Sequence, residues 1–102
     1  MVKSTARMIK KKKGEDVIVL DLRNRSPIAD FFIITTGLSP IHTKAIADDL
    51  IERQRPHHIE GMESGHWILL DYIDLIVHIF TKESRTFYGL ERLWGDAPQV
   101  KF

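Results

Sequence analysis

The sequence predicts a small α/β domain of the α+β type, with a mixed β-sheet of about five strands and flanking helices. A chain of 102 residues that is 43% hydrophobic and 28% charged has the size and composition of one globular domain. Short apolar runs rich in β-branched residues alternate with amphipathic segments of helical period, and glycine or proline separates them. We expect one domain without repeats or a long linker.

A short basic helix or tail is expected at residues 1–13, followed by the first two strands. The run VIVLDL at 17–22 is apolar and β-branched, as in a buried strand. A second such run, DFFIITT, occupies 30–36. These runs open the single folded domain, which we place at residues 14–102.

A helix is predicted to begin after these strands. Ser39 suits the N-cap of a helix, and Pro40 suits its first position. Apolar residues then recur on one side of the predicted helix, and charged residues take up much of the rest. Pro56 ends it, and the polar segment 57–65 fits either a short strand plus turn or a loop.

A hairpin is predicted next. Residues 67–70 and 75–80 are apolar runs, and the joint 71–74 (DYID) between them is short enough for a tight turn. We therefore expect two neighbouring antiparallel strands.

The final element is expected to be one amphipathic helix from Ser84 to Trp94. Its first stripe would hold Phe87, Leu90 and Trp94. A second stripe would hold Arg85, Tyr88 and Arg92. Because the second stripe is too polar for a core, we expect it to form a contact surface.

Charge is distributed unevenly along the chain. Residues 1–13 carry six basic side chains and no acid, whereas the rest carries nine basic and fourteen acidic groups, a charge of −5. An acidic body is repelled by phosphate backbones and attracted to a basic partner. The run Lys10–Lys13 suits either a peripheral RNA contact or a solvated helix end.

Several classes of protein are disfavoured. The absence of cysteine rules out disulfides, thiolate zinc sites and a cysteine nucleophile. No apolar run approaches the ~18 residues that a membrane-spanning helix needs, and no secretory signal is recognisable. We expect a cytoplasmic protein with no membrane partner.

Three polar groups are candidates for chemistry, and each has a simpler structural role. Asp71 and Asp74 carry the oxygen ligands that Mg²⁺ prefers, but turn aspartates more often bind local N–H groups. The strand–helix joint at Ser39 exposes N–H groups to anions, but a plain capped helix is favoured. The third group holds His57, His58, His66, Glu60 and Glu63. Adjacent histidines in an extended chain point apart, so a polar loop is favoured there over a metal site. With the simpler role favoured for each group, we expect no metal, no cofactor and no catalytic residue.

Aromatic and arginine side chains concentrate in the last third of the chain. Trp, Tyr and Arg dominate the energetics of protein interfaces because they offer large rigid areas with a polar end. Some of these aromatics must also fill the core of a chain this short. His78, alone in an apolar strand, is more often a core or interface residue than a catalyst. A binding protein is favoured over an enzyme.

Seven motifs, in order, carry a resemblance to a known family. They are VLDL at 19–22, SPIADFFII at 26–34, TGLS at 36–39, EG at 60–61, WILLDY at 67–72, VHIF at 77–80 and RTFYGLERLW at 85–94. From about residue 15 to 97, the chain resembles the ribosomal silencing factor family, also called Iojap-like. The resemblance implies a nucleotidyltransferase-like fold without transferase activity, because the strand carboxylate pairs of true transferases are missing.

The resemblance also implies a partner and a mechanism. The implied partner is ribosomal protein L-fourteen of the large (50S) subunit, at the face that meets the small subunit. Docking there would block joining of the 30S subunit and lower translation during nutrient shortage, and similar organelle proteins assist large-subunit assembly. Carried onto this chain, the partner-facing candidates are Trp67, Asp71, Tyr72, His78, Arg85, Phe87, Tyr88, Glu91 and Trp94.

Two features depart from the family pattern, and two alternatives remain open. Ile73 stands where members commonly have glycine, and the N-terminal segment is short, so we expect that segment to pack weakly. One alternative is a nucleotidyltransferase-like enzyme that binds metal and nucleotide through Ser39, Asp71 and Asp74. The other is an RNA-binding ribosome assembly factor that uses Lys10–Lys13. The exposed aromatics would also suit a homodimer when the protein is free.

Overall fold

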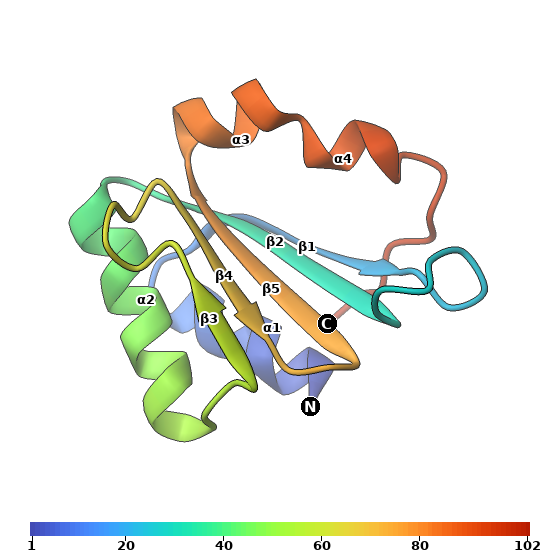
Figure 1. Ribbon diagram of the computed structural model, residues 1–102, viewed down its shortest axis with the longest axis horizontal. Coiled ribbons are helices and arrows are strands. Elements are labelled where there is room, and N and C mark those ends of the chain that lie inside the picture. Colours follow the sequence, from blue (N-terminus) through green and yellow to red (C-terminus); the bar gives the residue numbers. More distant parts are fainter.

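A five-stranded sheet organises the chain (Figure 1). The computed structural model describes residues 1–102. Its strands are β1 (Glu15–Asp21), β2 (Phe31–Gly37), β3 (His58–Glu60), β4 (Trp67–Asp71) and β5 (Leu75–Thr81). They lie in the order β1-β2-β5-β4-β3, with β2 parallel to β5 and all other neighbours antiparallel. The predicted mixed sheet and the 71–74 hairpin are confirmed.

Four helices cover the two faces of the sheet. They are α1 (Val2–Lys11), α2 (Pro40–Arg53), α3 (Lys82–Tyr88) and α4 (Leu90–Leu93). We call the face that carries α1 and α2 the first face; α3 and α4 lie over the opposite, second face (Figure 1). Alternation along β2 sends Ile33 to the core of the first face and Phe32 and Ile34 to that of the second.

The predicted start of α2 is confirmed. Ser39 adopts an extended backbone, and its hydroxyl oxygen accepts a hydrogen bond from the amide of His42 at 3.2 Å. Pro40 occupies the first turn, where a missing N–H costs nothing. The helix ends at Arg53, before Pro56. None of the helices has both the length and the apolar character needed to span a bilayer.

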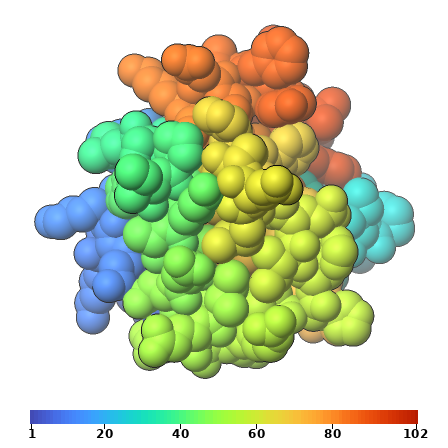
Figure 2. All heavy atoms as spheres, turned by 60° about the vertical axis from the view of Figure 1, so that its left-hand side comes forward, coloured from blue at the N-terminus to red at the C-terminus, as the bar shows by residue number.

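The expectation of weak packing at the N-terminus is wrong. Ala6 and Ile9 of α1 are completely buried against the first face. Figure 2 shows α1 in blue beside α2 in green, and Lys12 forms an ion pair with Asp49 of α2 at 3.5 Å. A short helix suffices because its apolar side chains all point to the sheet while its basic ones remain in solvent.

The single helix predicted for 84–94 is also wrong. The chain breaks at Gly89, whose φ of 55° lies in the left-handed region and ends α3, and α4 begins at the next residue. Left-handed glycine is a common helix terminator because it has no Cβ to clash. The two predicted stripes therefore do not form: Phe87 is 79% exposed, whereas Leu90 and Trp94 pack partly against the second face.

Candidate functional site

A stack of aromatic rings covers part of the second face. The Tyr88 ring of α3 lies 4.6 Å from that of Trp67 on β4, centroid to centroid, and Trp67 stacks on Phe80 of β5 at 5.0 Å. Phe87 meets Tyr88 edge-on at 5.0 Å. These distances are typical of favourable aromatic pairs. The stack joins α3 to the sheet.

The outer part of this stack is open to solvent. Phe87 is 79% exposed and Tyr88 is 53% exposed, and Trp67 and Leu69 are half-buried beside them. We call Trp67, Leu69, Phe87 and Tyr88 the aromatic surface. Large apolar side chains that stay exposed next to one another on a folded domain are typical of an interaction site.

His78 lies beneath the aromatic surface and is 3% exposed. Its Nδ1 accepts a hydrogen bond from the indole Nε1–H of Trp67 at 3.1 Å, which places the imidazole proton on Nε2. Nε2 is buried and has no hydrogen-bond partner. Burial lowers the pKa of His78 to about 4, so the imidazole is neutral at physiological pH. His78 therefore supports Trp67 from below.

Arg85 and Glu91 face each other. The Arg85 guanidinium donates to both carboxylate oxygens of Glu91, at 2.8 and 3.3 Å, and its Nη1 donates to the Thr36 hydroxyl at 2.8 Å. The Arg85 side chain is only 12% exposed. The Glu91 side chain is 41% exposed, so of the two it is Arg85 that offers little area to a partner.

Trp94 also serves the fold. Its ring packs edge-on against Phe32 at 6.1 Å, and it is half-buried against the second-face core. Trp94 therefore anchors the end of α4, and the exposed aromatic area is provided by α3.

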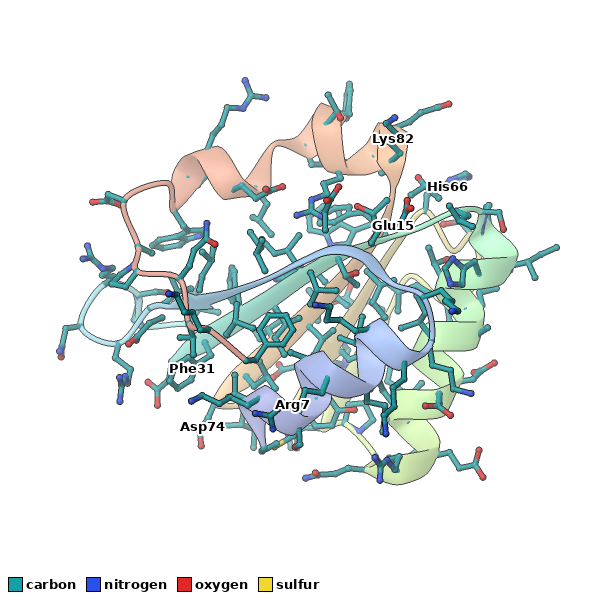
Figure 3. All side chains as sticks on the ribbon, turned by 180° about the vertical axis from the view of Figure 1, so that it is seen from behind. Arg7, Glu15, Phe31, His66, Asp74 and Lys82 are labelled. Carbon is teal, nitrogen blue, oxygen red and sulfur yellow. The ribbon has the colours of Figure 1, made fainter.

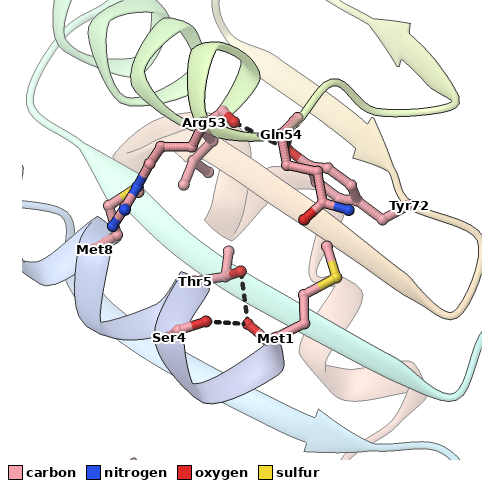
Figure 4. Close-up of a pocket in the computed structure, with 8 residues that line it drawn as sticks. Met1, Ser4, Thr5, Met8, Arg53, Gln54 and Tyr72 are labelled. Carbon is pink, nitrogen blue, oxygen red and sulfur yellow. Dashed lines mark hydrogen bonds between the residues drawn. The ribbon is translucent and has the colours of Figure 1, made fainter.

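Tyr72 lies on the first face, away from the aromatic surface. Its hydroxyl donates to the backbone carbonyl of Gln54 at 3.0 Å, at the end of α2 (Figure 4). The ring borders a pocket of about 240 Å³ between α1 and α2, and burial raises the pKa of the hydroxyl. Alternation along β4 explains the separation. Trp67, Leu69 and Asp71 point to the second face, whereas Ile68, Leu70 and Tyr72 point to the first. The structure thus does not bring Tyr72 together with the other candidates.

Asp71 has a local role at the hairpin turn. Its Oδ1 accepts a hydrogen bond from the amide of Ile73 at 2.7 Å, as the simpler interpretation of a turn aspartate predicts. Ile73 has a φ of 76°, a strained value for a β-branched residue. Where family members were expected to have glycine, this chain places isoleucine in a backbone conformation that favours glycine.

The alternative site at Ser39, Asp71 and Asp74 is not assembled. Ser39 follows Gly37, which pairs with the last residue of β5, whereas Asp74 precedes the first residue of β5. These groups therefore lie at opposite ends of one strand; Figure 3 shows Asp74 far from His66 and Lys82, which mark the other end. No three His, Asp or Glu side chains are grouped to hold a metal ion. Of the five-residue histidine group, the pair His58 and Glu60 is in contact, at 3.0 Å.

Leu69 is the surface residue that sequence reasoning missed. It pairs with His78 on one side and Glu60 on the other, at the edge of the aromatic surface that faces the edge strand β3. The signal was present in the spacing, because Leu69 lies two residues after Trp67 and a strand repeats its facing every two residues. Glu60 and Asp71 on the same face give this edge of the aromatic surface an acidic border.

The comparisons with known proteins agree on one family. The family model described as "Ribosomal silencing factor during starvation" matches residues 1–102. Proteins named ribosomal silencing factor from Halalkalibacterium halodurans and Bacillus subtilis are 44% and 39% identical to this chain, over 88% and 85% of it and 81% and 78% of their own lengths. A mouse protein named mitochondrial assembly of ribosomal large subunit protein 1 is 26% identical over 85% of this chain, which spans 42% of that longer protein.

Two crystal structures share the fold. A protein from Bacillus halodurans has a TM-score of 0.81 and 33% identity, covering 98% of this chain and 95% of its own. A protein from Chromobacterium violaceum has a TM-score of 0.83 and 28% identity, covering 100% and 92%. The α+β architecture is therefore that of solved structures over almost its whole length.

Proposed function

The chain belongs to the ribosomal silencing factor family, and we propose that it binds the large ribosomal subunit in the cytoplasm and represses translation by blocking subunit joining. The proposed partner is ribosomal protein L-fourteen, at the face of the 50S subunit that meets the 30S subunit. Relatives named as silencing factors and as a large-subunit assembly protein support the large subunit as the target.

One observation carries the proposed docking site: Phe87 and Tyr88 stay largely exposed although they stack on Trp67. Exposed aromatic side chains that already pack on a neighbouring ring are typical of the few residues that dominate binding energy, because they lose little side-chain entropy when a partner buries them. We assign the first contact with the partner to the aromatic surface.

Charge supports a basic protein as the partner. The aromatic surface is bordered by Glu60 and Asp71, and residues 14–102 carry a net charge of −5. Acidic groups at one edge of an apolar centre speed encounter with a basic protein and disfavour naked phosphate. Within this proposal, His78, Trp94 and Arg85 support the surface from within, and Glu91 holds Arg85 from its solvent side.

The proposed mechanism requires no bond-making. A folded body with principal extents of 34 × 29 × 23 Å, held at the subunit interface, excludes a competing subunit by occupying its place. Occupancy then depends on affinity and abundance alone. The chemistry of the site, aromatic carbon with a charged border, suits binding.

The test is sedimentation of purified 50S and 30S subunits with the protein present. We expect cosedimentation with 50S and fewer 70S particles, and capture of the protein by isolated L-fourteen. Phe87→Ala should weaken both, whereas Ile41→Ala, which removes an 83% exposed side chain on α2, should not. Unhindered 70S formation at saturating protein would contradict the proposed block, and no capture by L-fourteen would contradict the proposed partner.

We propose one peripheral contact in addition. Lys10, Lys11 and Lys13 are exposed on or just after α1, and only Lys12 of the run forms an ion pair, with Asp49. These lysines lie at the end of α1, where the Lys12 carbonyl meets His42 near the start of α2, and they suit ribosomal RNA at the margin of the docked protein. Removing their charge should reduce the salt dependence of 50S binding without abolishing binding.

Sedimentation equilibrium of the free protein tests whether the aromatic surface also supports a homodimer.

A further inference from the structure

The segment 82–94, which comprises α3 and α4, has little to hold it in place. Neither helix contains a buried residue, and helices of seven and four residues do not persist on their own. Half-buried Leu90 and Trp94 and the Tyr88 ring are its apolar contacts with the sheet. Because Phe87 and Tyr88 belong to this segment, the shape of the aromatic surface depends on how the segment is fixed.

Arg85 is the one side chain that ties together the three elements concerned. It lies on α3, donates to both carboxylate oxygens of Glu91 on α4, and donates to Thr36 on β2. A two-pronged arginine–carboxylate pair fixes direction as well as distance, and at 12% exposure the Arg85 side chain is shielded from water.

The pair exists only because the helix is broken. In an unbroken helix, side chains six positions apart lie about 9 Å apart along the axis and on different sides of it. Gly89, with its φ of 55°, turns the chain so that Glu91 returns to Arg85. The break and the ion pair therefore specify one geometry together.

We propose that Arg85 is a positioning residue: with Glu91 and Thr36 it clamps the segment 82–94 onto the sheet and so holds Phe87 and Tyr88 in the orientation that binds the partner. The effect on binding rests on the proposed function, whereas the clamp itself is a property of the free protein. The two are measured separately.

The first measurement is hydrogen exchange of the free protein, read by mass spectrometry. Arg85→Ala should speed exchange within 82–94 at least tenfold and leave the amides of β5 unchanged. Glu91→Gln, which keeps the shape and removes the charge, should act in the same way. Because both changes break one clamp, combining them should add little. Lys82→Ala, which removes an exposed cation of α3 that has no ion-pair partner, is the matched control and should change nothing.

The second measurement is affinity for the 50S subunit. Arg85→Ala should reduce it at least tenfold, and the exchanged pair Arg85→Glu with Glu91→Arg should restore part of both affinity and protection. Unchanged exchange in 82–94 accompanied by lost affinity would overturn the proposal, since it would show that Arg85 touches the partner directly. Independent, multiplying effects of the two substitutions on exchange would also overturn it. If the wild-type protein fails to bind 50S, the proposed function fails, and the exchange data still decide the clamp.

Discussion

Trp67 and His78 are joined diagonally across two strands: the indole N–H reaches Nδ1 of His78 at 3.1 Å, although in register Trp67 pairs with Phe80 and His78 pairs with Leu69. The bond fixes the indole under Tyr88 and makes His78 an acceptor at Nδ1. Because Nε2 already carries a proton, a second proton would have to bind Nδ1. The hydrogen bond from Trp67 would then be lost, or the ring would have to leave its buried position.

The first prediction concerns pH. The folded pKa of His78 is about 4, below the ordinary value of 6.5, so the unfolded chain binds the proton more readily. The contribution of neutral His78 to the free energy of unfolding is therefore fully present above pH 6.5 and is lost as the pH falls toward 4. By pH 5 the loss should be about 2 kcal/mol.

Urea unfolding at pH 7.5 and pH 5 measures this loss. His78→Phe, which cannot titrate, should be less stable at pH 7.5 because the Trp67 indole loses its acceptor, but should show a smaller decrease toward pH 5. An equal decrease in both proteins would assign the acid sensitivity to other groups.

The second prediction separates two aromatic residues of segment 82–94. Trp94→Ala should lower the free energy of unfolding by about 3 kcal/mol, because a half-buried indole packed on Phe32 leaves a cavity. Phe87→Ala should change it by less than about 0.5 kcal/mol, because that ring is 79% exposed. Thermal and urea unfolding measure both. A stability loss for Phe87→Ala as large as that for Trp94→Ala would place Phe87 in the core and remove it from the binding surface.

The third prediction concerns Ile73 at the hairpin turn. The Asp74 amide donates to the Tyr72 carbonyl two residues back, and Ile73 between them has a φ of 76°, as in a γ-turn. Ile73→Gly should stabilise the protein by up to about 1 kcal/mol, since glycine adopts this conformation without strain. Ile28→Gly, at another exposed isoleucine whose φ is not positive, should instead destabilise it. Urea unfolding of both variants checks the contrast. If Ile73→Gly lowered the free energy of unfolding, the positive φ at Ile73 would not be a source of strain.

The fourth prediction concerns Gly61, whose φ is 83° and where an added Cβ would lie 1.8 Å from the Trp67 carbonyl oxygen. Gly61→Ala should therefore cost about 2 kcal/mol or more and displace the backbone that carries Trp67. At Gly95 the nearest atom to an added Cβ is 3.6 Å away, so Gly95→Ala should be tolerated. Unfolding curves and tryptophan emission report on both. Equal effects at the two glycines would contradict the close approach.

The strands and α2 were predictable because local and tertiary signals agree there. Ser39 and Pro40 begin α2 for reasons that act within one turn, and the apolar runs of β2 and β5 reflect burial on both faces. The break in the helix predicted for 84–94 was not predictable in this way, because the apolar spacing continues in helical period through Gly89. The left-handed backbone at Gly89 is stabilised by contacts that α4 makes with α3 and the sheet, and these depend on the tertiary fold.

The structure also separates some of the partner-facing candidates from one another. Arg85 and Glu91 were expected at a partner surface, but six residues of separation gave no hint that they meet across the break. Tyr72 and Trp67 were both partner-facing candidates because the family motif at 67–72 contains both, although strand alternation sends them to opposite faces. The residue types predicted an aromatic and charged surface. Strand alternation and the break at Gly89 determine which of those residues lie on it.

The position of α1 has a consequence for how obstruction would work. Since α1 covers the face opposite Trp67, docking through the aromatic surface would turn Lys3 and Arg7 outward, toward an arriving particle rich in RNA (Figures 1 and 3). Such a particle would be attracted by those charges and not repelled. Exclusion would then owe nothing to electrostatic repulsion, and raising the ionic strength should leave a fully occupied subunit just as inaccessible.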